Sequence, residues 1–282
     1  MYGQRSGGFR INPTIIIALV MAAFALFRYY SNSSYNEVTG EKQRISMDPQ
    51  QEVAMGLQSR DQMAQEFGGY SRNREATEIV RRIGQQIVQN SSAKNTPYRY
   101  EFHLLADQQT INAFALPGGQ IFITEALLMR LTSDGQSLDK DMLAGVLGHE
   151  VGHVVARHSA ERMAQMELAQ GITGAVTMAT YDPNNPNSGY IAQAVSNMLQ
   201  LKYGRDQELQ SDDLGVRFML ETSQFDPEKL VAVMAILKQA SGPSRTPEFQ
   251  STHPDPENRA EHIRAAIEKY RKTGNRLSEH IH

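Results

Sequence analysis

The sequence predicts a mostly helical α+β domain with one small β-sheet, preceded by an apolar segment near the N-terminus. After residue 48, apolar residues recur at intervals of three and four, which is typical of helices with one buried face. The alternating pattern of a half-buried strand is confined to about 98–124. With 282 residues, the chain is long enough to bury a sizeable core in one large domain.

Composition excludes several classes of protein and of metal site. The chain has 28 Lys and Arg against 31 Asp and Glu and no long basic run, so it lacks the electrostatic footprint of a nucleic-acid-binding protein. It has no cysteine, which excludes disulfides and thiolate metal ligands. Any metal site must therefore be built from histidine, aspartate or glutamate.

The apolar segment runs from Ile15 to Phe27, after Arg5 and Arg10 and before Arg28-Tyr29-Tyr30. We favour an uncleaved membrane anchor, because Arg28 to Tyr30 stand where a signal peptide would have the small residues of its cleavage site. The run is shorter than the ~17–25 residues of a spanning helix, so a cleaved signal and a buried helix stay open as alternatives. An anchor or a signal would leave the positive N-terminus in the cytoplasm and export the rest.

These features divide the chain into four expected parts. They are a signal-anchor or signal segment over 1–30, a polar linker over 31–47, the folded domain over 48–272 and a polar tail over 273–282.

The first half of the domain should contain two helices followed by strands. Asp48-Pro49 supplies an N-cap and a proline at the first helical position, so a helix is expected from there to about residue 67. A second helix is expected over 74–90 and a strand over 98–104. Pro117-Gly118-Gly119 requires a turn before the β-rich run 120–124.

The second half should be helical. Helices are expected over 125–132, 139–166, 167–180 (buried), 190–222, 226–240 and 257–272. The segment 181–189 is interpreted as a connector or, alternatively, as a flap over a cleft, and 241–256 as a loop.

The motif His149-Glu150-Val151-Gly152-His153 lies in the expected helix 139–166. Residues four apart on a helix project about 40° from each other, so both imidazoles can reach one metal ion. Glu150 lies about 100° round from His149, beside the metal, where a carboxylate can accept a proton from a water. The pattern predicts a zinc hydrolase site, although two surface histidines on an ordinary helix would give the same sequence pattern.

A third ligand has a candidate in Glu208. Asp212 and Gly215 follow it on the same helix face, four and seven residues later, so this face can approach another helix closely. Gly145 and Gly152 would allow the same approach from the motif helix. Asp212 is then placed to accept the Nδ1–H of a ligand histidine and fix its tautomer.

Together, these motifs resemble the M48 family of zinc metallopeptidases over about 45–270. The segments that carry the resemblance are Asn112 to Gly119, Gly148 to His153, Arg157 to Arg162, Arg205 to Gly215, Ser251 to Pro254, and Arg259. The resemblance implies a gluzincin-type fold with a small antiparallel sheet, endopeptidase activity and one zinc ion per chain. It also implies the family's exported branch, which is linked to protein quality control in the cell envelope.

By motif position, the resemblance implies that His149, His153 and Glu208 bind the zinc and that Glu150 is the general base and acid. Asp212 matches a residue sometimes described as a proton donor. We favour the other role, in which Asp212 accepts a hydrogen bond from a ligand histidine, since a carboxylate paired in this way is poorly placed to protonate a leaving amine.

His253, in Ser-Thr-His-Pro, matches a family histidine that either occupies the zinc's open position or stabilises the oxyanion. Arg259 has two equal interpretations, an oxyanion donor and a salt bridge that holds its loop. His158, five residues after His153, would be rotated about 140° away on a continuous helix, which indicates a structural role. Leu209 and Ser211 depart from the family's usual aromatic residue and alanine, but neither is a ligand.

The expected function is zinc-dependent cleavage of unfolded or misassembled envelope proteins by a single-pass membrane protein with its domain on the exported, periplasmic side. Secretion after signal cleavage is the less favoured location. The segment 112–115 resembles the family's cleft strand, which would pair with an extended polypeptide. Two rival hypotheses are a zinc-containing chaperone or assembly factor with little proteolysis, and a non-catalytic membrane-tethered interaction domain.

Overall fold

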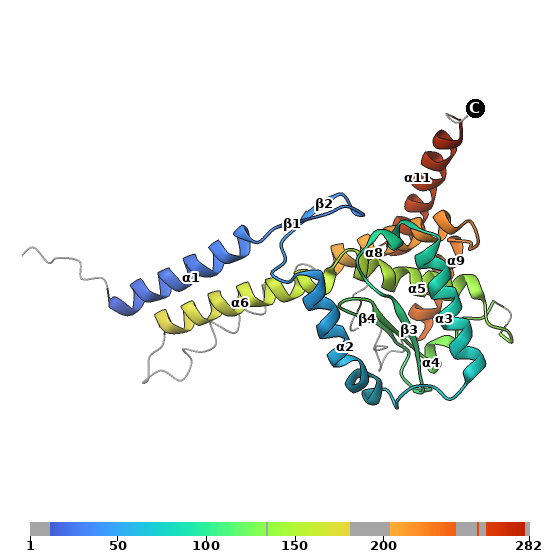
Figure 1. Cartoon of the computed structure of the whole chain (residues 1–282), viewed down its shortest axis with the longest axis horizontal. Helices are drawn as coiled ribbons and strands as arrows, with labels where there is room; N and C mark the ends of the chain where they lie inside the picture. The colour runs from blue at the N-terminus through green and yellow to red at the C-terminus, as the bar shows by residue number, and fades with distance from the viewer. Residues whose placement is uncertain (1–11, 134, 181–203, 241–252, 254–257, 280–282) are drawn as a thin grey trace, which may run out of the picture. The chain divides into compact units, whose positions relative to one another are not determined.

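The computed structural model describes residues 12–133, 135–180, 204–240, 253 and 258–279 (Figure 1). The chain divides into two compact units. Unit 1 comprises Met1–Ser34, Gln43–Ser46 and Glu161–Lys202, and unit 2 comprises Tyr35–Lys42, Met47–Ala160 and Tyr203–His282.

Unit 1 is built on the apolar helix α1 (Pro13–Ser31). Asn12 caps this helix by accepting a hydrogen bond from the Thr14 backbone N–H, and Pro13 occupies the first helical position. In the described part of the chain, α1 is the one helix that is long and apolar enough to cross a membrane, with a mean hydropathy of 1.7.

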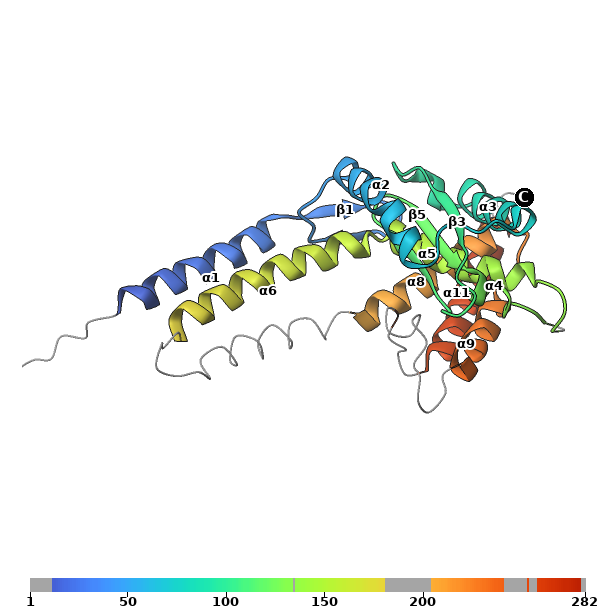
Figure 2. The same cartoon turned by 90° about the horizontal axis from the view of Figure 1, so that it is seen from below.

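Helix α6 (His158–Thr180), which lies in unit 1 from Glu161 onward, runs beside α1 (Figure 2). A Cβ at Gly171 would lie 2.7 Å from the Cβ of Ala25, so the glycine is needed for this approach. The prediction of a helix over 167–180 is confirmed, but that of full burial is wrong. Only Ala169 and Ala175 are buried among residues 167–179, since one face of the helix packs on a neighbour.

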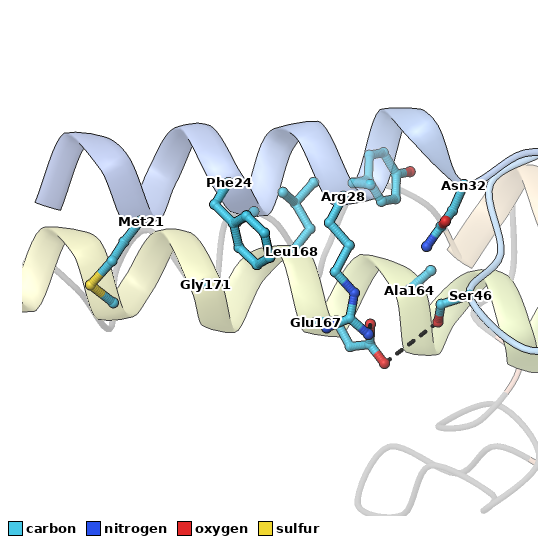
Figure 3. A pocket seen from close by; sticks show the side chains of 11 residues that line it. Met21, Phe24, Arg28, Asn32, Ser46, Ala164, Glu167, Leu168 and Gly171 are labelled. Atoms are coloured by element: carbon cyan, nitrogen blue, oxygen red, sulfur yellow. Dashed lines mark hydrogen bonds and ion pairs between the residues drawn. The ribbon is translucent and has the colours of Figure 1, made fainter. Parts of the chain in front are cut away.

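A pocket of about 200 Å³ lies between these two helices (Figure 3). Its polar end is formed by Arg28, whose Nη2 lies 3.1 Å from a carboxylate oxygen of Glu167, and by Ser46, which donates to the same carboxylate. Met21, Phe24 and Leu168 line the apolar part.

Unit 2 is mostly helical with small sheets, as the sequence predicts. Its strands are β1 (Ser34–Asn36) and β2 (Glu41–Gln43), whose outer residues Ser34 and Gln43 belong to unit 1, and β3 (Glu101–Leu105), β4 (Ala113–Leu116) and β5 (Gln120–Thr124). Its helices are α2 (Pro49–Glu66), α3 (Arg74–Gln89), the 3₁₀ turn η1 (Ser92–Asn95), α4 (Glu125–Leu128), α5 (Lys140–Val155), α8 (Gly204–Thr222), α9 (Glu228–Ala240) and α11 (Arg259–Glu279).

Some expected boundaries differ from the observed ones. β1 and β2 pair within the segment expected to be a plain polar linker, because the Asn36 side chain accepts from the backbone N–H groups of Val38 and Thr39 and closes a turn. Helix α11 extends to Glu279, beyond the expected end at 272. The expected loop 181–189, the first part of the expected helix 190–222 and most of the expected loop 241–256 lie outside the described residues.

The three-stranded sheet has the order β3-β5-β4. β4 and β5 form an antiparallel hairpin through Gly118 and Gly119, whose φ angles are +77° and +105°. β3 pairs with β5 in the parallel sense, so the expected antiparallel pairing is wrong for these two strands. The reason is topological: β3 lies beside β5, the second strand of the hairpin, so β5 is central and β3 and β4 are the two edges.

The periodicity predicts a helix that runs to residue 166, but helix α5 ends at Val155. Arg157 adopts a left-handed backbone with φ +56°, and α6 begins at the next residue. Such a conformation is unfavourable for a residue with a Cβ, so it needs support from elsewhere. The Arg157 side chain provides it, because Nε donates to Glu52 over 2.8 Å and Nη2 donates to the Met47 carbonyl over 2.8 Å.

Helices α5 and α8 approach each other through glycine. A Cβ on Gly152 would lie 2.9 Å from the backbone oxygen of Ser211, and one on Gly215 would lie 3.0 Å from the backbone nitrogen of His149. The expected roles of these two glycines are confirmed. Gly145 instead faces Leu230 of α9, and Gly148 is the second glycine of α5 that faces α8.

Replacing Gly152 with alanine should separate the two helices. We expect Gly152→Ala to destabilise the protein by about 1–3 kcal/mol, the usual cost of overpacking, in chemical unfolding. The matched control is Gly148→Ala, whose Cβ would lie 3.4 Å from the nearest atom, the Gly215 oxygen, and should be tolerated. Equal stability of both variants would show that the close approach at Gly152 is not needed.

Candidate metal centre

Four side chains from α5, α8 and the segment before α11 converge at one point. They are His149, His153, Glu208 and His253, and each offers one ligand atom within 4.8 Å of all the others. His149, Glu208 and His253 are buried, and the side chain of His153 is 10% exposed. The structure therefore brings together the three side chains that the sequence predicts as zinc ligands, and adds a fourth.

The spacing of the donor atoms fits a small tetrahedral ion. The Nε2 atoms of His149 and His153 lie 3.1 Å apart, and they lie 3.3 and 3.4 Å from the two carboxylate oxygens of Glu208. Two ligands at ~2.0–2.1 Å from a tetrahedral zinc would lie about 3.3 Å apart. The separation of the two Nε2 atoms is therefore close to that of two ligands on one tetrahedral zinc ion.

Asp212 holds His149 in the orientation that this site requires. The Nδ1 atom of His149 donates to Asp212 Oδ1 over 2.8 Å, so the Nε2 lone pair points into the donor set. Burial alone lowers the pKa of His149, but the carboxylates of Asp212 and Glu208 outweigh it and raise the value to about 9. The site thus favours positive charge.

Glu150 is fully buried beside the donor set. Among the described residues, neither of its carboxylate oxygens has a hydrogen-bond partner, and its nearest ionisable neighbour is His253 Nε2 at 3.6 Å. Burial raises the pKa of this carboxyl. A buried carboxyl that makes no hydrogen bond is costly unless a bound group supplies one, so this carboxyl is suited to accept a proton from a group bound in the site.

His253 links the donor set to the sheet. Its Nδ1 lies 3.1 Å from both carboxylate oxygens of Glu208, and its Nε2 lies 3.3 Å from the backbone oxygen of Ala113 in β4. The sequence predicts that His253 approaches the metal, but nothing in it indicates the contact with β4.

Residues 73–267 match the model of peptidase family M48. The chain belongs to this family. M48 metallopeptidases use zinc, and the donor set of three imidazoles and a carboxylate, with the buried carboxyl of Glu150 beside it, fits that ion. Family and donor set together identify an M48 zinc metallopeptidase domain.

Several M48 relatives are similar to the chain. It is 29% identical to the beta-barrel assembly-enhancing protease of Escherichia coli (strain K12) over 190 residues, 65% of this chain and 37% of that protein. It is 31% identical to the mitochondrial metalloendopeptidase OMA1 of Schizosaccharomyces pombe over 189 residues, 66% of this chain and 52% of the relative. The metalloprotease YcaL of E. coli (strain K12) is 25% identical over 75% of each chain. The match thus spans about a third to a half of the first two relatives.

In this M48 site, Arg259 forms a salt bridge, which is one of the two roles left open by its sequence. Its Nε donates to Asp212 Oδ2 over 2.6 Å and its Nη2 to Oδ1 over 2.9 Å, while Nη2 lies 3.6 Å from Glu208. Burial raises the pKa of Asp212, but Arg259 and His149 lower it by more. Both oxygens of Asp212 are therefore engaged as acceptors.

Removing the guanidinium should leave buried negative charge uncompensated. We expect Arg259→Leu to cost about 3–5 kcal/mol in the free energy of unfolding, measured with chemical denaturant. Adding Asp212→Asn in the same chain removes the stranded charge and should recover part of the loss. Arg259→Leu with the stability of the parent protein would contradict the assigned salt bridge.

Proposed function

We propose that this protein is a zinc-dependent endopeptidase that cleaves unfolded or extended stretches of polypeptide. The observation that carries the proposal is the convergence of His149, His153 and Glu208 beside the buried carboxylate of Glu150, whose oxygens accept no hydrogen bond from the described residues. This combination supplies a metal site and a proton acceptor at one place, which is what metal-assisted hydrolysis requires.

In the proposed reaction, His149, His153 and Glu208 hold the zinc. When bound, zinc polarises the scissile carbonyl and lowers the pKa of a water toward ~7. Glu150 takes the proton of the attacking water on a carboxylate oxygen and delivers it to the nitrogen of the leaving amine. Its burial helps it to hold that proton between the two steps, since burial favours the neutral acid.

Asp212 acts through His149 in this proposal and not as a proton donor to the amine. Its two oxygens accept hydrogen bonds from His149 and Arg259, which fixes the imidazole tautomer and keeps the carboxylate charged.

The substrate is proposed to lie along β4. In the part of the chain that the structure describes, β4 is one of the two edge strands of its three-stranded sheet, and its Ala113 carbonyl lies 3.3 Å from Nε2 of His253 in the donor set. An extended polypeptide can add to such an edge by backbone hydrogen bonds, which recognise an extended shape more than a sequence. This favours unfolded or loop-exposed segments over folded ones.

The proposed biological role is quality control of envelope proteins by a single-pass membrane protein. α1 has the length and hydropathy of a spanning helix, and Arg28, Tyr29 and Tyr30 at its end are typical of an interfacial anchor. The name of the E. coli relative, beta-barrel assembly-enhancing protease, supports a role in the envelope.

The domain would then lie on the exported, periplasmic side, where protease added to intact spheroplasts should digest it.

Replacing the proposed general base tests the reaction. Glu150→Gln should lower the rate of casein cleavage by about 10²–10⁴-fold, because the amide cannot accept the proton. Zinc content and fold should not change, and a chelator should abolish cleavage by the parent protein. Glu228→Gln, at an exposed position on α9, is the matched control and should cleave normally. Equal cleavage by the Glu150 variant and the control would exclude the peptidase hypothesis.

A chaperone or assembly factor with little proteolysis is the second candidate function. It is favoured by His253, whose ring takes the fourth place in the donor set and contacts the β4 edge where the substrate is proposed to bind. In that arrangement the histidine would compete with both the attacking water and the substrate strand.

Removing this histidine distinguishes its two predicted roles. If His253 closes the site, His253→Ala should cleave casein several-fold faster and bind zinc less tightly, because the site loses one donor. If His253 instead stabilises the oxyanion, cleavage by the variant should fall by roughly 10²–10³-fold. We expect the first result, measured as kcat/KM together with the zinc dissociation constant.

A further inference from the structure

His158 is a buried histidine that the proposed reaction does not use. It is the first residue of α6, it belongs to unit 2, and its side chain faces the donor set. Its Nδ1 lies 2.8 Å from the Nδ1 of His153, and its Nε2 lies 2.7 Å from Gln210 Oε1. These contacts place it directly behind a candidate zinc ligand.

The chain of hydrogen bonds has one direction, which is fixed at its outer end. The exposed carboxylate of Glu41 accepts only, so the amide nitrogen of Gln210, 2.7 Å away, donates to it. The amide oxygen of Gln210 then faces His158 and accepts from its Nε2–H. A neutral His158 with its proton on Nε2 has an acceptor at Nδ1, so His153 donates its Nδ1–H there.

We propose that His158 is a positioning residue that orients His153 and holds it in the Nδ1–H tautomer, with the Nε2 lone pair directed at the metal. This inference rests on the proposed function, because it takes His153 as a zinc ligand. Each histidine of the motif then has its own support: the carboxylate of Asp212 for His149 and the neutral ring of His158 for His153.

The break between α5 and α6 is what brings His158 to this place. On a continuous helix, the residue five after His153 would be rotated about 140° away from it. The left-handed backbone of Arg157 ends α5 and lets the next residue turn back toward the site. The contacts of Arg157 with Glu52 and the Met47 carbonyl hold that break. The support of His153 is thus built into the connection between two helices.

Two substitutions of His158 distinguish the loss of its hydrogen bond to His153 from the loss of its side-chain volume. The side-chain oxygen of asparagine can stand where Nδ1 of His158 stands and accept the same hydrogen bond, whereas leucine cannot. In the full-length protein, His158→Leu should raise the zinc dissociation constant by about 10–100-fold, measured by competition with a chelator. His158→Asn should recover most of the affinity. His103→Leu, which removes a histidine whose ring stacks on Phe122 outside the donor set, is the control and should bind zinc like the parent.

The tautomer of His153 gives a second readout. It would not change on substitution of His158 if His158 only contributed to folding. Histidine ¹⁵N NMR of the zinc-free parent protein should show the proton of His153 on Nδ1; His158→Asn should retain it there, and His158→Leu should shift it toward Nε2. A proton on Nε2 of His153 in the parent, or zinc binding by His158→Leu within twofold of the parent, would overturn the proposal. Neither readout depends on cleavage, so a protein that binds zinc with this tautomer but cleaves nothing would refute the peptidase function alone.

Discussion

The close approach of α5 and α8 is the constraint on which the site depends. Gly152 and Gly215 let the two backbones meet, and this contact sets His149 and His153 opposite Glu208. Because the ligand atoms must lie within a few ångströms of one ion, a methyl group at either glycine would move the carboxylate relative to the imidazoles. Metal binding in this fold therefore depends on the close packing of α5 against α8.

Buried charge explains why the two helices need a cation between them. The carboxylates of Glu150, Glu208 and Asp212 are all buried within one small region, and the buried guanidinium of Arg259 pairs with two of them. Carboxylates held this way are costly unless their charge is balanced. A divalent ion held by the converging histidine nitrogens and Glu208 would supply positive charge at this place.

Support for the donor set comes from parts of the chain that are far apart in sequence. Asp212 on α8 orients His149, and Arg259 at the start of α11 holds Asp212. On the other side, His158 lies behind His153 and is itself bonded to Gln210. The donor atoms are thus fixed by neighbours as well as by their own helices, which pre-organises the site for a metal.

Helical periodicity predicts which side chains share a helix face at the candidate metal centre, but not what surrounds them. The four-residue spacing of His149 and His153 and of Glu208 and Asp212 follows from the geometry of one helix, so the sequence predicts which side chains share a face. The contact of His158 with His153 was not predicted from the sequence, because it depends on the left-handed backbone of Arg157, which no periodicity indicates. The parallel β3–β5 pair was not predicted for a similar reason, since strand order is set by tertiary packing.

The central claim, that one zinc ion joins α5 to α8, is tested most directly by an anomalous-difference map of the crystalline protein at the zinc absorption edge. The account predicts a single strong peak within ~2.0–2.2 Å of the Nε2 atoms of His149 and His153 and of a carboxylate oxygen of Glu208. No peak at that position in zinc-loaded crystals, or a peak bound by the histidines with Glu208 turned away, would contradict it.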